Sequence, residues 1–214
     1  MASDARSPHT PGRKSDEPRP DLQRQDAVSK VRQAMASAVG LIPVTTAAAH
    51  AICDVMSAAQ TTVILIDKDY YWDVADVWVQ RPEIETSPKR SRYPISEYPV
   101  GTERLMAGRG YFSGDAVDEA LIEVKRLWPS ISVGSIMGVP IIALGEIHGE
   151  IFLMRDEASP PFSRDDLDVV AELAPLVGAR LPALLANYAD DDPKDADGAS
   201  LMPRLATRFK DFLQ

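Results

Sequence analysis

The sequence predicts an α+β fold, in which helices pack against an antiparallel sheet. Residues 133–185 hold two apolar runs of strand length, a proline-rich loop and a long helical pattern in succession. Residues 26–127 hold a helical region first, followed by strands and short helices. This order, with helices and strands grouped along the chain, favours an α+β domain built on an antiparallel sheet.

The apolar runs at residues 137–144 and 147–154 form a predicted hairpin. Gly145-Glu146 lies between them and is the expected two-residue turn, since glycine accepts a positive φ. After a proline pair, the Ser163 hydroxyl is expected to accept a backbone N–H and start a helix that continues to Tyr188. Apolar residues then recur at helical spacing.

The N-terminal half divides into shorter elements. A helix is expected from Asp26 to Ile42, where Pro43 interrupts it, and Thr45 or Thr46 is the expected cap of a second helix that ends near Ser57. Strands are expected at residues 61–66, 71–80 and 91–96, with a polar turn at 67–69. Short helices are expected at residues 101–106 and 117–127.

Three motifs occur in a characteristic order. Gly138-Val139-Pro140 starts one strand, Gly149 opens the next, and Phe162-Ser163 with Asp166-Leu167 starts the last helix. Over residues 133–188 this arrangement closely resembles the C-terminal half of a GAF domain, and residues 26–132 are consistent with the rest. The resemblance implies a GAF-like antiparallel sheet with the N- and C-terminal helices packed together on one face. It also implies a sensory or regulatory ligand-binding module, but no single chemistry.

Composition limits the class of protein. The chain has 214 residues, 45% of them hydrophobic, and a net charge of −9; its mean hydropathy is −0.16. No apolar run approaches the roughly 18 residues of a membrane span, and the N-terminus has no secretion signal, so we expect a cytoplasmic protein. The acidic balance disfavours nucleic acid as a partner. A single cysteine, Cys53, excludes an intramolecular disulfide and a cysteine-based metal cluster.

Four segments follow from composition. Residues 1–24 are polar and proline-rich and are expected to be a disordered tail, whereas residues 25–188 form the GAF-like domain. Residues 189–199 read as an acidic linker, and residues 200–214 as a short amphipathic helix. That helix is expected to dock into a groove, either on a partner protein or on this domain itself.

The sequence contains no catalytic motif that predicts an enzyme. The sequence has no nucleophile elbow, phosphate-binding loop, zinc-protease motif or dinucleotide fingerprint. His50 and Cys53 share a helix face but have no further ligands at metal spacing, and Trp72 and Trp78 occupy the calcium-loop positions that follow Asp67.

The special activities of known GAF domains do not transfer to this chain either. Methionine sulfoxide reduction needs two cysteines, and the bilin- and haem-binding members need a Cys or His that residues 81–130 lack. The pattern of the cyclic-nucleotide-binding members has Glu where Leu167 follows Asp166. We therefore name no cofactor.

Aromatic residues gather between Tyr70 and Trp128, where a GAF fold covers its ligand cavity. Aromatic walls with a few polar groups are typical of small-molecule sites, although aromatic side chains also fill ordinary cores. We expect a cavity between the sheet and residues 81–129. The candidate ligand-binding residues are Tyr71, Trp78, Tyr93, Arg104, Arg109, Tyr111, Phe112 and Trp128. An arginine in the cavity would favour a carboxylate or phosphate, and surface solvation is the alternative for each arginine.

Two functions remain open at this point. One is a regulatory GAF-type module that binds an unidentified small molecule and signals through its terminal helices to a partner protein. The other is a ligand-free dimerisation or scaffolding unit. A homodimer is expected through the first helix and residues 163–188. A second apolar stripe in the last helix, formed by Val169, Leu173, Leu176 and Leu184, supports this expectation.

Overall fold

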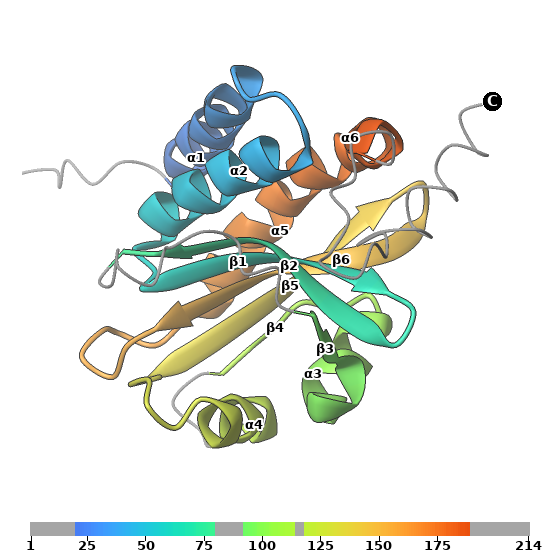
Figure 1. Ribbon diagram of the computed structural model, residues 1–214. Helices are drawn as coiled ribbons and strands as arrows, with labels where there is room; N and C mark the ends of the chain where they lie inside the picture. Colours follow the sequence, from blue (N-terminus) through green and yellow to red (C-terminus); the bar gives the residue numbers. More distant parts are fainter. Residues whose placement is uncertain (1–19, 80–91, 114–117, 189–214) are drawn as a thin grey trace, which may run out of the picture.

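A six-stranded antiparallel sheet forms the centre of the molecule, with helices on both faces (Figure 1). The computed structural model of the protein describes residues 20–79, 92–113 and 118–188. The strand order is β3-β2-β1-β6-β5-β4. The strands are β1 (Gln60–Asp67), β2 (Tyr70–Trp78), β3 (Arg92–Pro94), β4 (Tyr111–Phe112), β5 (Ser135–Ala143) and β6 (Glu146–Arg155). The predicted α+β class and antiparallel sheet are confirmed.

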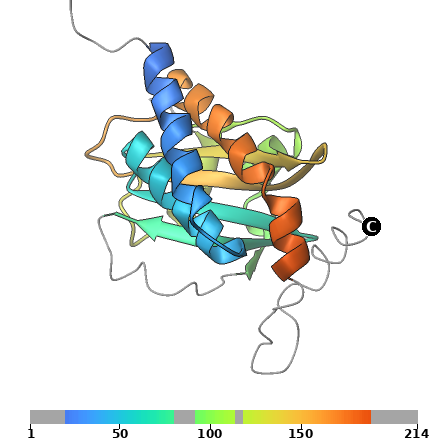
Figure 2. The same ribbon diagram turned by 90° about the horizontal axis from the view of Figure 1, so that it is seen from above.

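The helices divide between the two faces of the sheet (Figure 1). One face carries α1 (Pro20–Ala36), α2 (Leu41–Met56), α5 (Arg164–Gly178) and α6 (Leu181–Tyr188). The other carries the 3-10 turn η1 (Ile95–Glu97), α3 (Pro99–Met106) and α4 (Glu119–Leu127). Seen from above, α1 crosses over α2 and lies beside α5 (Figure 2). The terminal helices therefore pack together on one face, as expected.

The N-terminal helices begin and end at other residues than predicted. α1 starts at Pro20, within the expected disordered tail, and the break before α2 falls at residues 37–40 rather than at Pro43. Pro43 lies in the first turn of α2, where its missing amide hydrogen costs no helical hydrogen bond. Thr45 does not cap the helix, because its hydroxyl lies inside α2 and donates to the Leu41 carbonyl at 2.9 Å.

The β5–β6 hairpin has its turn one residue earlier than predicted. Leu144 and Gly145 have φ values of 53° and 81°, and Glu146 already belongs to β6. Two successive positive φ values are typical of a type I′ turn, whose twist matches that of the strands. Gly145 therefore supplies a positive φ in the turn, as predicted, but at the second turn position instead of the first.

The start of α5 is confirmed and its predicted length is wrong. The Ser163 hydroxyl accepts the Asp166 amide hydrogen, and the Asp166 carboxylate accepts that of Ser163 at 2.8 Å, which completes a capping box. The expected single helix to Tyr188 is divided into α5 and α6, which are bent by 44°. Pro182 has no amide hydrogen to offer the Gly178 carbonyl, so the hydrogen-bond ladder stops between them.

A continuous apolar core lies between the sheet and α2, α5 and α6. Its large buried side chains include Leu65, Trp72, Ile151, Phe162 and Leu173. The stripe that suggested a dimer belongs to this core: Leu173 and Leu184 are buried, and Val169 and Leu176 pack against the core cluster. Two side chains of this stripe are therefore used within one chain and two are partly exposed, so the stripe no longer supports a homodimer, which stays a prediction.

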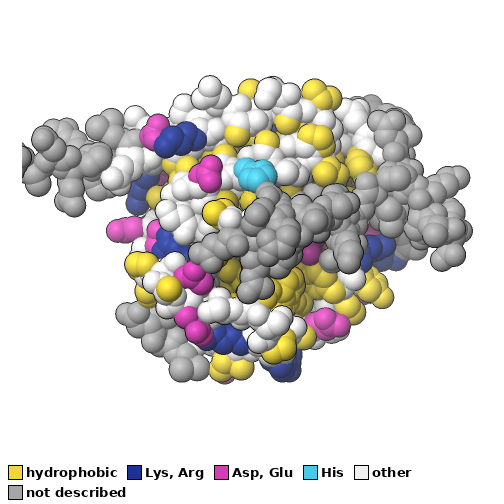
Figure 3. All heavy atoms as spheres, turned by 60° about the vertical axis from the view of Figure 1, so that its left-hand side comes forward, with side chains coloured by type: hydrophobic (Ala, Val, Ile, Leu, Met, Phe, Trp, Pro, Cys, Tyr) yellow, Lys and Arg dark blue, Asp and Glu magenta, His cyan; other side chains and the backbone are white. Residues whose placement is uncertain are grey.

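The visible surface mixes charges of both signs with apolar atoms (Figure 3). Exposed ion pairs such as Arg24–Glu172 at 3.2 Å and Lys125–Glu157 at 3.1 Å connect separate elements. Among the described residues, no single helix is long and apolar enough to cross a membrane; α5 and α6 meet that length and composition only as a bent pair. The predicted linker at residues 189–199 and helix at residues 200–214 lie outside the described residues.

Candidate functional site

A one-residue bulge in β2 decides which side chains reach the lower face of the sheet, which is the face that carries α3 and α4 (Figure 1). Val63 of β1 pairs with Ala75, whereas the next residue, Ile64, pairs with Asp73, so Val74 is the extra residue. Residues three apart in a regular strand point to opposite faces, but the bulge returns Asp76 to the face of Asp73. Two carboxylates of one strand therefore lie on the side away from α2 and α5.

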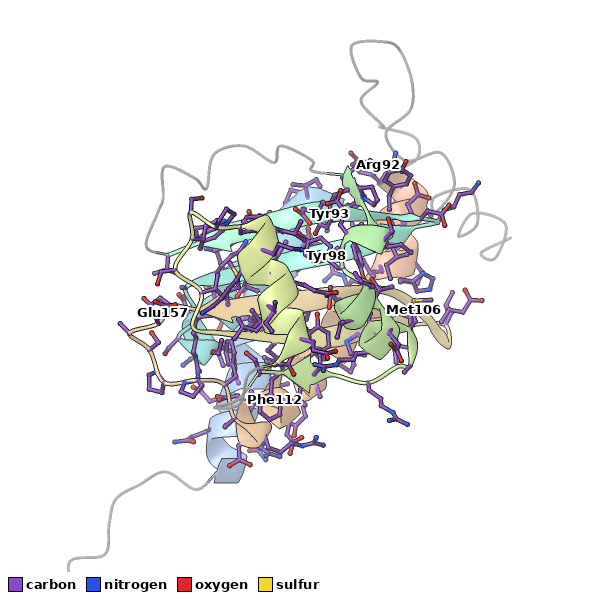
Figure 4. The ribbon with its side chains drawn as sticks, turned by 90° about the horizontal axis from the view of Figure 1, so that it is seen from below. Arg92, Tyr93, Tyr98, Met106, Phe112 and Glu157 are labelled. Atoms are coloured by element: carbon purple, nitrogen blue, oxygen red, sulfur yellow. The ribbon has the colours of Figure 1, made fainter. Side chains whose placement is uncertain are left out.

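A cavity lies between this lower face of the sheet and the helices α3 and α4. Figure 4 views the molecule from this side, with both helices in front of the sheet. The cavity volume, counted as the space open to the centre of a water molecule, is about 40 Å³. The lining residues come from strands, helices and the residues around them: Gln60, Thr62, Ile64, Tyr71, Asp73, Tyr93, Tyr98, Gly101, Tyr111, Ala120, Glu123, Val124, Trp128, Ile136, Glu150, Phe152 and Met154.

Asp73 and Glu150 form an acidic pair across the cavity. Both pair with Ile64, from its two opposite sides, so they are two strands apart and their Cα atoms are separated by about 10 Å. The Tyr93 hydroxyl donates to Asp73 at 2.9 Å, and the Tyr111 hydroxyl donates to Glu150 at 3.3 Å. Glu150 is buried, and Asp73 is partly exposed.

Burial makes both carboxyl groups weak acids. Desolvation raises the pKa of Glu150 from 4.5 to about 8, opposed by the hydrogen bond from Tyr111 and assisted by the charge of Asp73. Desolvation also raises the pKa of Asp73 from 3.8 to about 7, opposed by the hydrogen bond from Tyr93. Near neutral pH the pair therefore lies close to its titration, and a nearby positive charge would draw off its protons.

Two other carboxylates near the cavity have their hydrogen bonds satisfied by the protein. Asp76 accepts from Gln60 Nε2 at 2.6 Å, from the Thr62 hydroxyl at 2.9 Å and from Trp78 Nε1 at 2.9 Å. Glu123 of α4 accepts from the backbone amides of Val100 and Gly101 in the first turn of α3, at 3.0 and 3.4 Å. These acids fix the walls, which distinguishes them from Asp73 and Glu150.

The tyrosines of the cavity are locked by hydrogen bonds and ring contacts. The Tyr71 and Thr102 hydroxyls lie 2.7 Å apart, and Thr102 donates to the Ile95 carbonyl. The Tyr98 hydroxyl accepts from Trp128 Nε1 at 3.0 Å. The Tyr93 and Tyr98 rings lie beside each other, with centroids 5.4 Å apart (Figure 4). Burial raises the pKa of each of the cavity tyrosines, so they stay neutral at physiological pH.

Gly138 makes room for the contact between Tyr111 and Glu150. It pairs with Tyr111 in the β4–β5 ladder and lies under the tyrosine ring. A Cβ atom at this position would lie 2.6 Å from Glu150 Oε2 and would overlap the ring of Tyr111. The absence of a side chain at Gly138 is therefore a requirement of the cavity.

Four of the eight predicted site residues meet at the cavity. Tyr71, Tyr93, Tyr111 and Trp128 line the cavity. Trp78 lies behind this wall, where it stacks on Trp128 with ring centroids 6.4 Å apart.

The other three predicted residues lie elsewhere. Phe112 pairs with Met137 and packs against the core on the opposite face. Arg104 donates to Asp118 at 2.9 Å. Arg104, the exposed Arg109 and Phe112 line a separate surface groove, together with Tyr111 and Arg164. Neither arginine lines the acidic cavity, so neither supplies the expected recognition of a carboxylate or phosphate there.

The sequence reasoning missed the polar side chains of the cavity. These are Gln60, Thr62, Asp73, Glu123 and Glu150, together with the aromatic Tyr98 and Phe152. Among the described residues, no three His, Cys, Asp or Glu side chains are grouped in a way that could hold a metal ion. Within the same described part of the chain, the lining contains no Cys, Ser, His, Lys or Arg. The arrangement is suited to binding, with aromatic walls around hydrogen-bond acceptors.

Comparison with known proteins identifies the fold family. The family model of the GAF domain matches residues 25–181. The chain belongs to the GAF domain family. A search among curated proteins finds no match to the chain.

Solved GAF domains share this architecture at low sequence identity. The GAF domain of an Acinetobacter phosphoenolpyruvate-protein phosphotransferase is 15% identical, with a TM-score of 0.58 over 80% of this chain and 97% of that one. The corresponding domain from Coxiella burnetii is also 15% identical, with a TM-score of 0.60 over 78% and 98%. The phycocyanobilin-bound GAF domain of a cyanobacterial phytochrome is 12% identical, with a TM-score of 0.58 over 80% and 98%. These likenesses show the fold alone.

Proposed function

We propose that this GAF domain is a non-enzymatic regulatory module that binds a small molecule in the cavity on the lower face of its sheet. The observation that supports the proposal is the convergence of buried polar side chains on an empty volume. A buried carboxyl group such as that of Glu150 destabilises the fold whenever it is charged, and a hydrophobic residue would avoid this cost. A scaffold without a ligand gains nothing from such an arrangement.

The same strand that carries Glu150 offers a route to the terminal helices. Arg155, at the end of β6, donates to the Met56 carbonyl at the end of α2 at 2.6 Å. It also lies within 3.4 Å of the Asp166 carboxylate in the first turn of α5 and stacks over Phe162 at 4.2 Å. A shift of β6 on ligand binding would therefore act on both helices, and we propose that a partner protein reads this change.

A cavity-filling variant tests the binding proposal. Ala120 lines the cavity and is buried, so Ala120→Leu occupies the volume, whereas Ala171→Leu adds the same atoms at an exposed position of α5. Native mass spectrometry and thermal-shift screening against a metabolite library are applied to both variants and to the wild type. We expect a ligand that stabilises the wild type and Ala171→Leu but not Ala120→Leu, with all three folded by circular dichroism.

The rival scaffold function makes the opposite prediction. If no compound co-purifies with the wild type and none shifts its melting temperature, the ligand-free scaffold replaces the binding module. We also propose that the protein is cytoplasmic.

The expected homodimer is tested by light scattering, because much of the apolar stripe that suggested it packs in the core. A mass that stays monomeric at every concentration excludes the dimer.

A further inference from the structure

We infer that the cavity binds a small organic cation carrying N–H donors, such as an amidinium, guanidinium or primary ammonium group, held between Asp73 and Glu150. This inference rests on the proposed function and specifies its ligand. It differs from the carboxylate or phosphate that the arginines had suggested.

The charge of the cavity is the first argument. The acidic side chains that face it or support it are Asp73 and Asp76 from β2, Glu123 from α4 and Glu150 from β6. No lysine, arginine or histidine is present among the described residues that line it. Arg104, the cation over the Tyr111 ring, is engaged by both carboxylate oxygens of Asp118. The positive charge that would offset Asp73 and Glu150 is therefore left for a ligand to bring.

An unused hydrogen-bond acceptor is the second and independent argument. Gln60 lines the cavity at 3% exposure, and its Oε1 atom is buried without a hydrogen-bond partner among the described residues. Its Nε2 atom donates to Asp76 at 2.6 Å, which fixes the orientation of the amide. A buried acceptor without a partner costs free energy, so Gln60 adds an unpaired acceptor to the wall beside the two acids.

Most donors of the cavity are already used within the protein, although the Tyr98 hydroxyl only accepts, from Trp128, among the described residues. The Tyr93 and Tyr111 hydroxyls donate to the two acids, and the indole N–H of Trp128 is given to Tyr98. Each carboxylate accepts only one of the hydrogen bonds described here, although a carboxylate has about four acceptor positions. A ligand rich in N–H groups fits this surplus of acceptors, whereas an anion would meet them with repulsion.

The walls and the volume limit the ligand further. Rings of Tyr71, Tyr93, Tyr98, Tyr111 and Trp128 surround the acids, and aromatic faces attract organic cations. A volume of about 40 Å³ holds roughly three water-sized groups, since one water needs about 10–15 Å³ of such space. A compact head group matches this size. A bare metal ion is not the expected occupant, since the described residues hold no cluster of three suitable ligands.

Three probes of equal size separate charge from shape. Acetamidinium, acetamide and acetate each have four non-hydrogen atoms and are cationic, neutral and anionic. Binding to the full chain is measured by isothermal titration calorimetry and thermal shift at pH 8. We expect acetamidinium to bind at least tenfold more tightly than acetamide or acetate. Asp73→Asn and Glu150→Gln should each weaken the binding of acetamidinium at least tenfold, whereas Glu103→Gln at an exposed position of α3 should leave it unchanged.

Proton release gives a second measurement. A cation binds the ionised pair, so acetamidinium affinity should rise between pH 6 and pH 8.5, by up to about tenfold per pH unit for each acid below its pKa. Calorimetry in two buffers of different ionisation enthalpy should show protons leaving the protein on binding.

The outcomes separate this inference from the proposed function. If acetamide or acetate binds as tightly as acetamidinium, or if Asp73→Asn and Glu150→Gln leave the affinity unchanged, the inference of a cationic ligand is wrong. The proposed ligand-binding function then still stands. If none of the probes binds and the metabolite screen is also empty, both the inference and the proposed function fall.

Discussion

Replacing Glu150 by glutamine should change how stability depends on pH. Burial raises the pKa of this group to about 8 in the folded protein, against 4.5 for an ordinary glutamate. The folded state therefore holds the proton more tightly than the unfolded state does. It follows that the wild type is stabilised at acidic pH and loses this stability as the pH rises from about 4.5 to about 8. Glu150→Gln keeps an acceptor for Tyr111 but has no proton to lose.

The size of the effect follows from the displacement of the pKa. At 1.36 kcal/mol per pKa unit, the stability of Glu150→Gln relative to the wild type should grow by on the order of 4 kcal/mol between pH 5 and pH 9. At about 2–4 °C per kcal/mol for a domain of this size, the gap in melting temperature should widen by roughly 8–16 °C.

Equilibrium unfolding in urea, followed by circular dichroism at constant ionic strength, measures this difference. Glu103→Gln is the matched control, because it makes the same chemical change at an exposed position of α3 and should leave the two curves parallel. If Glu150→Gln also ran parallel to the wild type from pH 5 to pH 9, Glu150 would be solvated in the folded protein. The acidic cavity would then have no energetic basis.

Three further substitutions test other parts of the argument. Gly138→Ala should cost about 1–3 kcal/mol and abolish the ligand-induced thermal shift, because its methyl group overlaps the Tyr111 ring; unchanged stability would contradict the tight contact. Arg155→Lys should destabilise by about 1–3 kcal/mol and speed hydrogen exchange in the first turn of α5, since one ammonium group cannot replace the fork to Met56 and Asp166; normal exchange would exclude it as the link between β6 and α5. Ser163→Ala should cost about 0.5–2 kcal/mol in urea unfolding through loss of the capping box, and a neutral result would refute the role of this cap.

The fold was predictable because its signals are local. Alternating or continuous apolar runs mark the strands, and Ser163 with Asp166 marks the start of α5 within four residues of sequence. The division of the last helix was missed even though Pro182 stands in the sequence. A proline is tolerated in the first turn of a helix, so its position alone does not say whether it interrupts one helix or begins another.

The site was only half predictable, because its chemistry depends on pairing between distant strands. Aromatic residues such as Tyr93 and Tyr111 stand out by composition and do line the cavity. Asp73 and Glu150 are 77 positions apart in the sequence and meet only through their common neighbour Ile64. No local pattern reports such a pair, and an isolated acidic residue in a strand reads as a solvent-facing position.

The bulge at Val74 means that the character of the cavity depends on the local shape of β2 as well as on the identity of its residues. Deleting Val74 would keep every aspartate and tryptophan of the strand. It would also leave Asp73 and Asp76 two residues apart in a regular strand, so both would keep facing the cavity and the register with β1 would be unchanged. Straightening the bulge with every residue kept would instead turn one of the two aspartates toward the apolar core. Related chains are best compared by strand register, since two aspartates three residues apart share a face only where the bulge is present.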